Sequence, residues 1–161
     1  MSGYCLQRGI SGLHAHNAEL LSPSALNTFG LVSDVRSYVD RMEKAVEVFA
    51  QVLQRDPTSA VTLDNLAVAK AHLTGVAAAQ EEITAARTSL FGLDQDDLHR
   101  CYGLGGLAAI EAEDDEAFRH LARAIGLNRE AATDWVEKNA AWRNLRDDPR
   151  FTELLTVTTD S

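Results

Sequence analysis

The sequence predicts an all-α protein, and two observations carry that prediction. Alanine and leucine, which both favour helices, supply 24 and 20 of the 161 residues, while glycine supplies 10 and proline only 3. Apolar residues also recur with helical spacing along nearly the whole chain. An all-β sandwich or barrel is excluded, because it needs a turn signal about every 8 to 12 residues. A chain of this length can bury a core of its own as a single domain, 1–161.

Apolar spacing and turn residues together divide the chain into helical segments. Three kinds of residue mark the predicted boundaries: capping side chains, prolines and glycines. The predicted helices lie at residues 5–21, 24–37, 40–55, 58–73, 76–90, 95–112, 115–126, 129–142 and 148–156.

Capping residues support several of these helix starts. Ser22 is a good N-cap, and Pro23 suits the first position of a helix. Asp56 and Pro57 repeat that pair 34 residues later. Asp94, with Asp97 three residues on, can cap the predicted helix 95–112 and favours the positive end of that helix.

The same order of large and small apolar residues occurs three times, with spacings of 34 and then 38 residues. Each unit predicts two antiparallel helices, and a small residue lies where the helices cross most closely. One such pair cannot cover its own apolar stripe, so neighbouring pairs must stack. The equivalent positions are Phe29, Val32, Ser33, Ala45, Phe49 and Val52, then Leu63, Leu66, Ala67, Ala79, Ile83 and Ala86, then Cys101, Leu104, Gly105, Ala117, Leu121 and Ala124.

With this period and these residues the chain resembles the tetratricopeptide repeat (TPR) family. The resemblance implies a short TPR-like α-solenoid of stacked antiparallel helix pairs with capping helices. An ordinary helical bundle with coincidental spacing is the alternative. The residues that carry the resemblance are Ala45 with Phe49, the closing Asp56 and Pro57, the small Ala67 and Gly105, and the terminal run from Leu145 to Phe151. The implied division is an N-terminal capping segment at 1–25, repeats at 26–59, 60–97 and 98–131, and a C-terminal cap and tail at 132–161.

The two ends of the stack need caps, because a solenoid otherwise exposes its core. Residues 4–21 are expected to cap one end. Trp135, Trp142 and Phe151 are expected to cover the other. The excess of arginine over lysine, 12 to 3, together with the alanine content hints at a bacterial source with a GC-rich genome.

In the TPR family the first helices of successive pairs line a concave groove that binds a peptide, so the resemblance implies a protein-binding module, a scaffold or adaptor without catalytic activity. Tyr38 and Tyr102 are the expected anchors, and Asp34 and Asp64 are expected to select a partner with basic and apolar groups. The predicted groove residues are Asn27, Asp34, Tyr38, Asp64, Val68, His72, His99, Tyr102 and Ile110, with Gly30, Val61 and Gly106 beside them.

Charge excludes other partners. With 15 basic and 24 acidic residues the net charge is −9, which repels nucleic acid and anionic membranes. No apolar run approaches the roughly 18 residues of a membrane span, so a cytoplasmic protein is expected. Most of the net charge lies in residues 94–120, which makes that segment the place to look for a basic partner.

Neither a cofactor nor a metal is expected. Cys5 and Cys101 form no C-x-x-C pattern and are interpreted as buried apolar residues. His14 and His16 are two apart on a predicted helix, so their side chains diverge. The glycine-rich stretch 103–106 follows no strand and has no lysine after it, which favours a close-packed or loosened stretch of helix over a phosphate loop. Its glycines predict either a kink or the close approach of a ligand backbone at this point.

Two other functions remain open at this point. The protein could be a self-associating scaffold, in which residues 1–22 or a second copy fill the groove. It could instead be a small-ligand or catalytic protein using His72, His99 and Asp64, although no triad, metal set or phosphate loop is recognisable.

Overall fold

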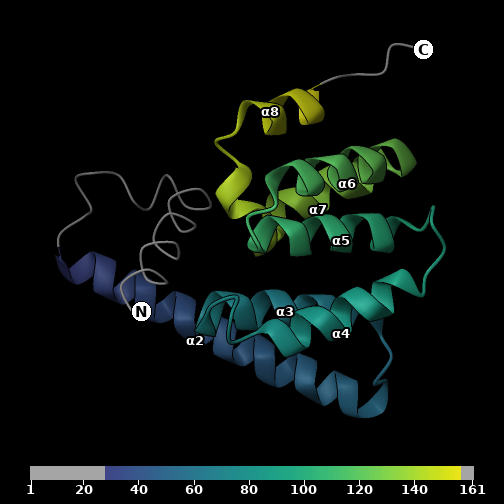
Figure 1. Ribbon diagram of the computed structural model, residues 1–161. Coiled ribbons are helices and arrows are strands. Elements are labelled where there is room, and N and C mark those ends of the chain that lie inside the picture. Colours follow the sequence, from purple (N-terminus) through teal and green to yellow (C-terminus); the bar gives the residue numbers. More distant parts are fainter. Residues whose placement is uncertain (1–27, 157–161) are drawn as a thin grey trace.

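The computed structural model describes residues 28–156, and the surroundings of side chains from residue 36 onward. Every element in that range is helical, which confirms the all-α prediction (Figure 1). The elements are α2 (Thr28–Arg55), α3 (Ala60–Thr74), α4 (Gln80–Phe91), α5 (Leu98–Ile110), α6 (Asp114–Leu127), α7 (Arg129–Lys138), the 3-10 helix η1 (Ala140–Leu145) and α8 (Pro149–Thr156).

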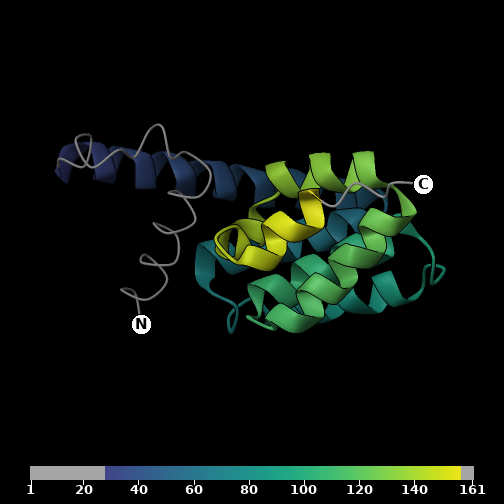
Figure 2. The same ribbon diagram turned by 90° about the horizontal axis from the view of Figure 1, so that it is seen from above.

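Helix α2 corrects the predicted start of the fold. The sequence analysis expected two helices, 24–37 and 40–55, but one helix runs from Thr28 to Arg55. No glycine or proline separates the two segments, so the helical hydrogen-bond ladder has no reason to stop there. The first predicted repeat, 26–59, therefore contains one helix in its described part instead of a pair. Figure 2 shows the N-terminal half of α2 extending past the other helices.

Two helical hairpins form the centre of the molecule, as predicted. Helices α3 and α4 pack together, and so do α5 and α6, while α5 also contacts both α3 and α4. Gly75 ends α3 with φ 93°, a left-handed value that glycine tolerates. The hairpin turn before α6 contains Ala112 at φ 63°.

The caps of α3 and α5 differ from those predicted. Ser59, not Asp56, caps α3, and its hydroxyl accepts a hydrogen bond from the Thr62 amide. Asp97, not Asp94, caps α5 by accepting from the Arg100 amide. In both cases the capping side chain lies three residues closer to the helix, next to the amides it must reach.

Small residues occupy the helix crossings of the two hairpins. Alanine at these positions is fully buried, and larger apolar residues from the same repeat pattern surround it in the core. Because alanine has a single methyl group, the backbones approach closely at these points. The buried alanines are Ala67, Ala79, Ala86, Ala117 and Ala124.

The glycines of α5 serve close packing. The helix is unbroken from Leu98 to Ile110, so the glycines do not interrupt it. A Cβ atom at Gly103 would lie 2.8 Å from a Leu90 methyl carbon, and one at Gly105 would lie 2.7 Å from the Trp142 ring. The stretch is thus a close-packed part of the helix, approached by neighbouring side chains of the same protein.

The C-terminal segment folds back along the hairpins. The helix predicted over 129–142 ends at Lys138, and the Asn139 side chain caps η1 by accepting from the Ala141 amide. Trp142 is completely buried against α5, and Phe151 of α8 is also buried in the core, whereas Trp135 is only partly buried.

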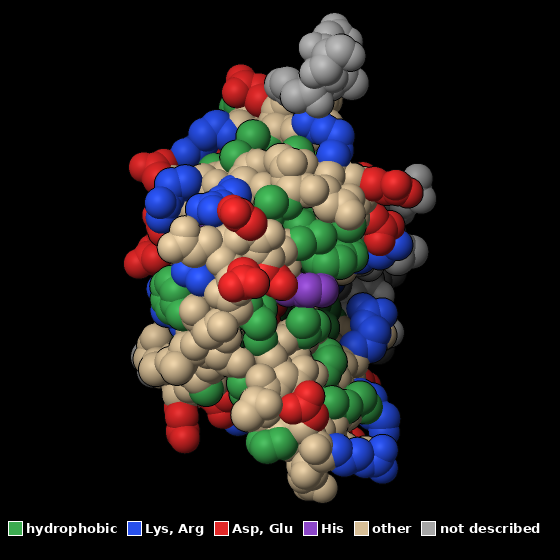
Figure 3. Space-filling view, turned by 90° about the vertical axis from the view of Figure 1, so that its right-hand side faces the viewer, with side chains coloured by type: hydrophobic (Ala, Val, Ile, Leu, Met, Phe, Trp, Pro, Cys, Tyr) green, Lys and Arg blue, Asp and Glu red, His purple; other side chains and the backbone are tan. Residues whose placement is uncertain are grey.

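Three of the eight acidic residues in the segment 94–120 pair with arginines outside that segment, on the helices α4, α6 and α8. Arg123 contacts Asp96 at 2.6 Å, Arg150 contacts Asp115 at 2.6 Å, and Arg87 pairs with Glu111. On the face drawn in Figure 3, acidic and basic side chains are interspersed. None of the described helices combines the length and apolar character needed to cross a membrane.

Candidate functional site

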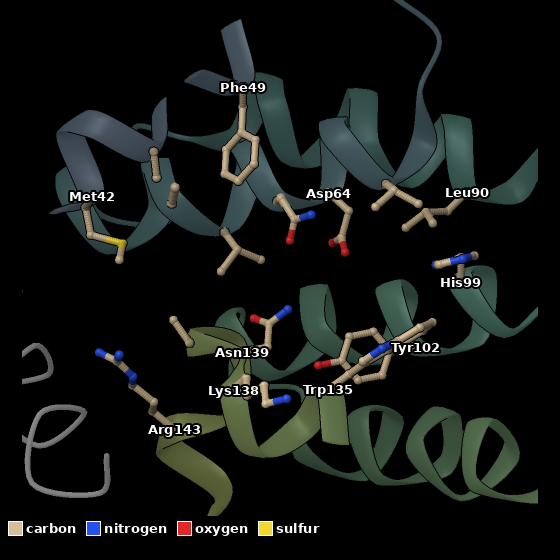
Figure 4. A pocket seen from close by; sticks show the side chains of 16 residues that line it. Met42, Phe49, Asp64, Leu90, His99, Tyr102, Trp135, Lys138, Asn139 and Arg143 are labelled. Atoms are coloured by element: carbon tan, nitrogen blue, oxygen red, sulfur yellow. The ribbon is translucent and has the colours of Figure 1, made fainter. Parts of the chain in front are cut away.

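A pocket of about 570 Å³ opens between two sets of helices, and we call it the interhelix pocket. Helices α2, α3 and α4 form one wall, while α5, α7 and η1 form the other (Figure 4). Most of the lining side chains are apolar or aromatic. The lining residues are Met42, Ala45, Phe49, Val61, Asp64, Asn65, Val68, Ala69, Leu90, His99, Tyr102, Trp135, Lys138, Asn139, Ala140 and Arg143.

Three aromatic rings in contact with one another form one side of the interhelix pocket. The His99 imidazole lies nearly parallel to the Trp135 indole, with ring centroids 4.9 Å apart and an interplanar angle of 19°. Tyr102 meets Trp135 edge-on at 5.3 Å. Offset and edge-to-face contacts of this kind hold aromatic side chains in fixed positions. The pocket therefore offers a rigid aromatic surface to an occupant.

Asp64 extends from α3 into the interhelix pocket (Figure 4). Asp64 is only 7% exposed, and its Oδ1 atom is buried without a hydrogen-bond partner. Burial raises the pKa of the Asp64 carboxyl to about 7. The side chain faces Gly103 of α5, where an added Cβ would lie 3.3 Å from Oδ2. A glycine at that position thus leaves space for the carboxyl group.

Arg143 of η1 lines the other end of the interhelix pocket. It too is only 7% exposed, and its Nε and Nη1 atoms are buried without hydrogen-bond partners. Its guanidinium carbon lies 4.8 Å from the centroid of the Tyr38 ring, a cation–π contact. Burial lowers the pKa of Arg143, although arginine stays charged at neutral pH.

His72 and Tyr38 lie beside the interhelix pocket but do not line it. The His72 Nε2–H group donates to the Ala140 carbonyl at 3.1 Å, and the His72 ring meets Tyr38 edge-on at 6.3 Å. Burial and the nearby Arg143 lower the pKa of His72 to about 4, so the imidazole is neutral at physiological pH. His72 thus links α3 to η1.

The pocket gathers some of the predicted groove residues and leaves out others. Val61, Asp64, Val68, His99 and Tyr102 line it. Ile110, predicted to face the groove, is buried in the core, and Gly106 packs against Ala141 of η1. Asn27 lies outside the described residues, and the surroundings of Gly30 and of the Asp34 side chain are not described either. Of the three residues named for the catalytic alternative, His99 and Asp64 line the pocket and His72 does not.

Sequence reasoning missed the contribution of the C-terminal segment. Trp135, Lys138, Asn139 and Arg143 were assigned to a cap, yet they form much of one wall. A signal for this was present: Trp135 lies 34 residues after Cys101, where a further unit of the repeat would begin. Following that spacing would have placed α7 beside the earlier first helices.

Comparison with known proteins assigns no family to the chain. No protein-family model matches it, and no curated protein and no solved structure matches it. Within residues 28–156 no group of three or more histidine, cysteine, aspartate or glutamate side chains is arranged to hold a metal ion. The chemistry of the site is therefore argued from the interhelix pocket itself, which offers apolar area, aromatic faces and two buried charged groups.

Proposed function

We propose that the protein is a non-enzymatic interaction module that holds a segment of a partner protein in the interhelix pocket. One observation carries the proposal: a pocket of about 570 Å³ whose walls are mainly apolar and aromatic and come from two separate sets of helices. Buried aromatic side chains in such pockets are typical anchors at protein interfaces. The volume suits one or two large side chains of a bound segment.

A TPR-like arrangement is part of the proposal, and the packing of the hairpins supports it. The first helices of successive hairpins, α3 and α5, contact each other, and the equivalent small residues of the two hairpins are buried. Helix α7, which packs on α6, would then act as the first helix of a further unit. The interhelix pocket would lie on the face where first helices line up.

The chemistry of Cys101 is compatible with the cytoplasmic location that we propose. Its thiol is unpaired and buried, and burial raises its pKa. Such thiols persist in a reducing compartment and are inert when shielded in a core.

Two valines provide a matched test of the pocket. Val61 and Val52 are each 41% exposed, but only Val61 lines the interhelix pocket. A tryptophan at position 61 would enter the pocket, whereas one at position 52 would add bulk to the outer face of α2. Peptides are first selected from a random displayed library on the wild-type protein, and their affinities are then measured by fluorescence polarisation.

Val61→Trp should weaken binding of the selected peptides by about tenfold or more, equivalent to about 1.4 kcal/mol, and Val52→Trp should change it by less than about twofold. Both variants should keep the wild-type circular dichroism spectrum. Equal effects of the two substitutions, or a library that selects no peptide on the wild-type protein, would contradict the proposed function.

A further inference from the structure

Three groups that line the interhelix pocket have buried polar atoms without a hydrogen-bond partner among the described residues, namely the Tyr102 hydroxyl, Asp64 and Arg143, and the last two can carry opposite charges. Asp64 and Arg143 are each about nine-tenths or more buried, and each has buried polar atoms without a hydrogen-bond partner. Burial of a charged or polar group without a partner costs several kcal/mol, so such groups are uncommon in folded proteins. Their presence in one pocket points to groups supplied by an occupant.

Asp64 needs a hydrogen-bond donor. No ion pair or hydrogen bond of its side chain joins it to the other described residues. The facing position on α5 is Gly103, which has no side chain that could donate. Asn65 and His99 line the same pocket without bonding to the carboxyl group. An ammonium or guanidinium group placed here would supply both the donors and the opposite charge.

Arg143 needs a hydrogen-bond acceptor. The Tyr38 ring covers one face of its guanidinium group, but a ring face does not accept the in-plane N–H bonds. The described residues supply no carboxylate partner for it within ion-pair distance. Lys138, the other cation of the wall, already pairs with Asp134 on its own helix. A carboxylate in the pocket would therefore meet an Arg143 guanidinium whose donors are still unused.

The two groups come from opposite walls of the interhelix pocket and lie apart. Asp64 lies on α3 and Arg143 on η1, and Figure 4 shows the polar Asn139 and Lys138 side chains between them, while the Tyr102 and Trp135 rings lie on the Asp64 side. They do not pair with each other, so each charge is left for the occupant. An occupant that satisfies both must carry a positive group at Asp64 and a negative group at Arg143, and it also meets the aromatic rings beside Asp64.

We propose that the interhelix pocket recognises a dipolar peptide segment, with a lysine or arginine side chain at Asp64, an apolar residue against Tyr102 and Trp135, and an aspartate or glutamate side chain at Arg143. This inference rests on the proposed function and specifies the chemistry of the partner. It also alters the expectation from sequence, in which acidic groove residues select a basic partner alone: the buried Arg143 adds a requirement for an acidic group.

Selection from an array of acetylated and amidated peptides on the full chain tests the charge pattern. The blocked ends leave side chains as the only source of charge. Wild-type protein should select peptides that contain a basic, an acidic and an apolar residue within one short segment. Asp64→Asn should remove the preference for the basic residue and keep that for the acidic one, whereas Arg143→Met should do the reverse.

In fluorescence polarisation each substitution should weaken binding of a selected dipolar peptide by about tenfold, and should change the affinity for the matching singly charged peptide by less than about twofold. If Arg143→Met fails to fold, as judged by circular dichroism, Arg143→Gln takes its place. Removal of the acidic residue from the peptide must in any case weaken wild-type binding. Val52→Trp serves as the control that retains the full preference.

Each remaining result would overturn the inference in a distinguishable way. Selected apolar peptides with no charge preference would refute the charge pattern and leave the proposed function standing, whereas an array that yields no binder would refute both. Displacement of the selected peptides by a synthetic peptide of residues 1–22 at similar concentration would assign the pocket to the chain's own N-terminal segment. A dimer in light scattering that Arg143→Met dissociates would assign it to a second copy.

Discussion

Helix α5 meets its neighbours in two opposite ways. Toward η1 it presents Gly105 and Gly106, and the Trp142 and Ala141 side chains fit against them so closely that a Cβ at Gly105 would lie 2.7 Å from the indole. Toward α3 and α7 it presents His99 and Tyr102, and there the interhelix pocket remains open. Residue size at adjacent positions of one helix thus separates a tightly packed seam from a space that can receive a ligand.

The two tryptophans can test this difference, because one lies in the packed seam between α5 and η1 and the other lines the interhelix pocket. Trp142 is completely buried in the seam, so Trp142→Ala should lower the free energy of unfolding by about 3–5 kcal/mol. Trp135 is partly buried in the pocket wall, so Trp135→Ala should cost less than about 2 kcal/mol but should abolish peptide binding. Urea unfolding and fluorescence polarisation measure the two effects. Equal losses of stability would contradict the division into seam and pocket.

The pH dependence of stability can test whether the Asp64 carboxyl group on α3 lacks a partner within the protein. The pKa of the carboxyl rises from an ordinary 3.8 to about 7 in the fold, so the folded state binds the proton more tightly than the unfolded state does. The free-energy cost of burying the ionised Asp64 carboxyl is absent below pH 3.8, grows between pH 4 and 7, and is complete above pH 7. Asp64→Asn should therefore gain stability relative to wild type as pH rises from 4 to 8, by up to about 4 kcal/mol.

The quantity to compare is the difference in the free energy of unfolding between wild type and Asp64→Asn, measured by urea unfolding at each pH. His72 titrates in the same range with the opposite sign, because its pKa is lowered to about 4 and the fold loses stability as pH falls from about 6.5 toward 4. Subtracting one curve from the other removes this contribution. A difference that stays constant from pH 4 to 8 would show that Asp64 finds a partner within the protein.

Two glycines offer a smaller and opposite pair of effects. Gly105→Ala places a methyl group against Trp142 and His120, so the free energy of unfolding should fall by about 1–3 kcal/mol. Gly126 of α6 has no atom within 4 Å of its added Cβ, so Gly126→Ala should raise it by about 0.5–1 kcal/mol through helix propensity alone. Thermal and urea unfolding measure both. A stabilising Gly105→Ala would show that the seam is looser than described.

The fold was predictable where the sequence carries strong local signals. The helix crossings follow from alanines such as Ala67 and Ala117, whose small size is needed wherever the period places them. The helix break expected before Asp40 is wrong. It was inferred from the repeat, and no glycine or proline at that point supports a break. The repeat pattern was thus a weaker predictor of this helix boundary than the local residues were.

The site was only partly predictable, because five of its sixteen lining residues come from the C-terminal segment that folds back on the hairpins. Val61, Asp64, Val68, His99 and Tyr102 follow from helical spacing on α3 and α5. Arg143 joins them only because η1 returns beside α3, and nothing in the local sequence states where a short 3-10 helix will pack. That Asp64 and Arg143 lack partners is likewise a property of the assembled pocket.

The indole signals of the two tryptophans in a nitrogen–proton NMR titration test the central claim most directly. The chain contains only these two tryptophans, so each region has one side-chain reporter. On addition of a selected peptide, the Trp135 signal should shift with saturation while the Trp142 signal stays in place, because only Trp135 lines the interhelix pocket. Saturable binding that leaves Trp135 unmoved, or that shifts Trp142 alone, would contradict the account.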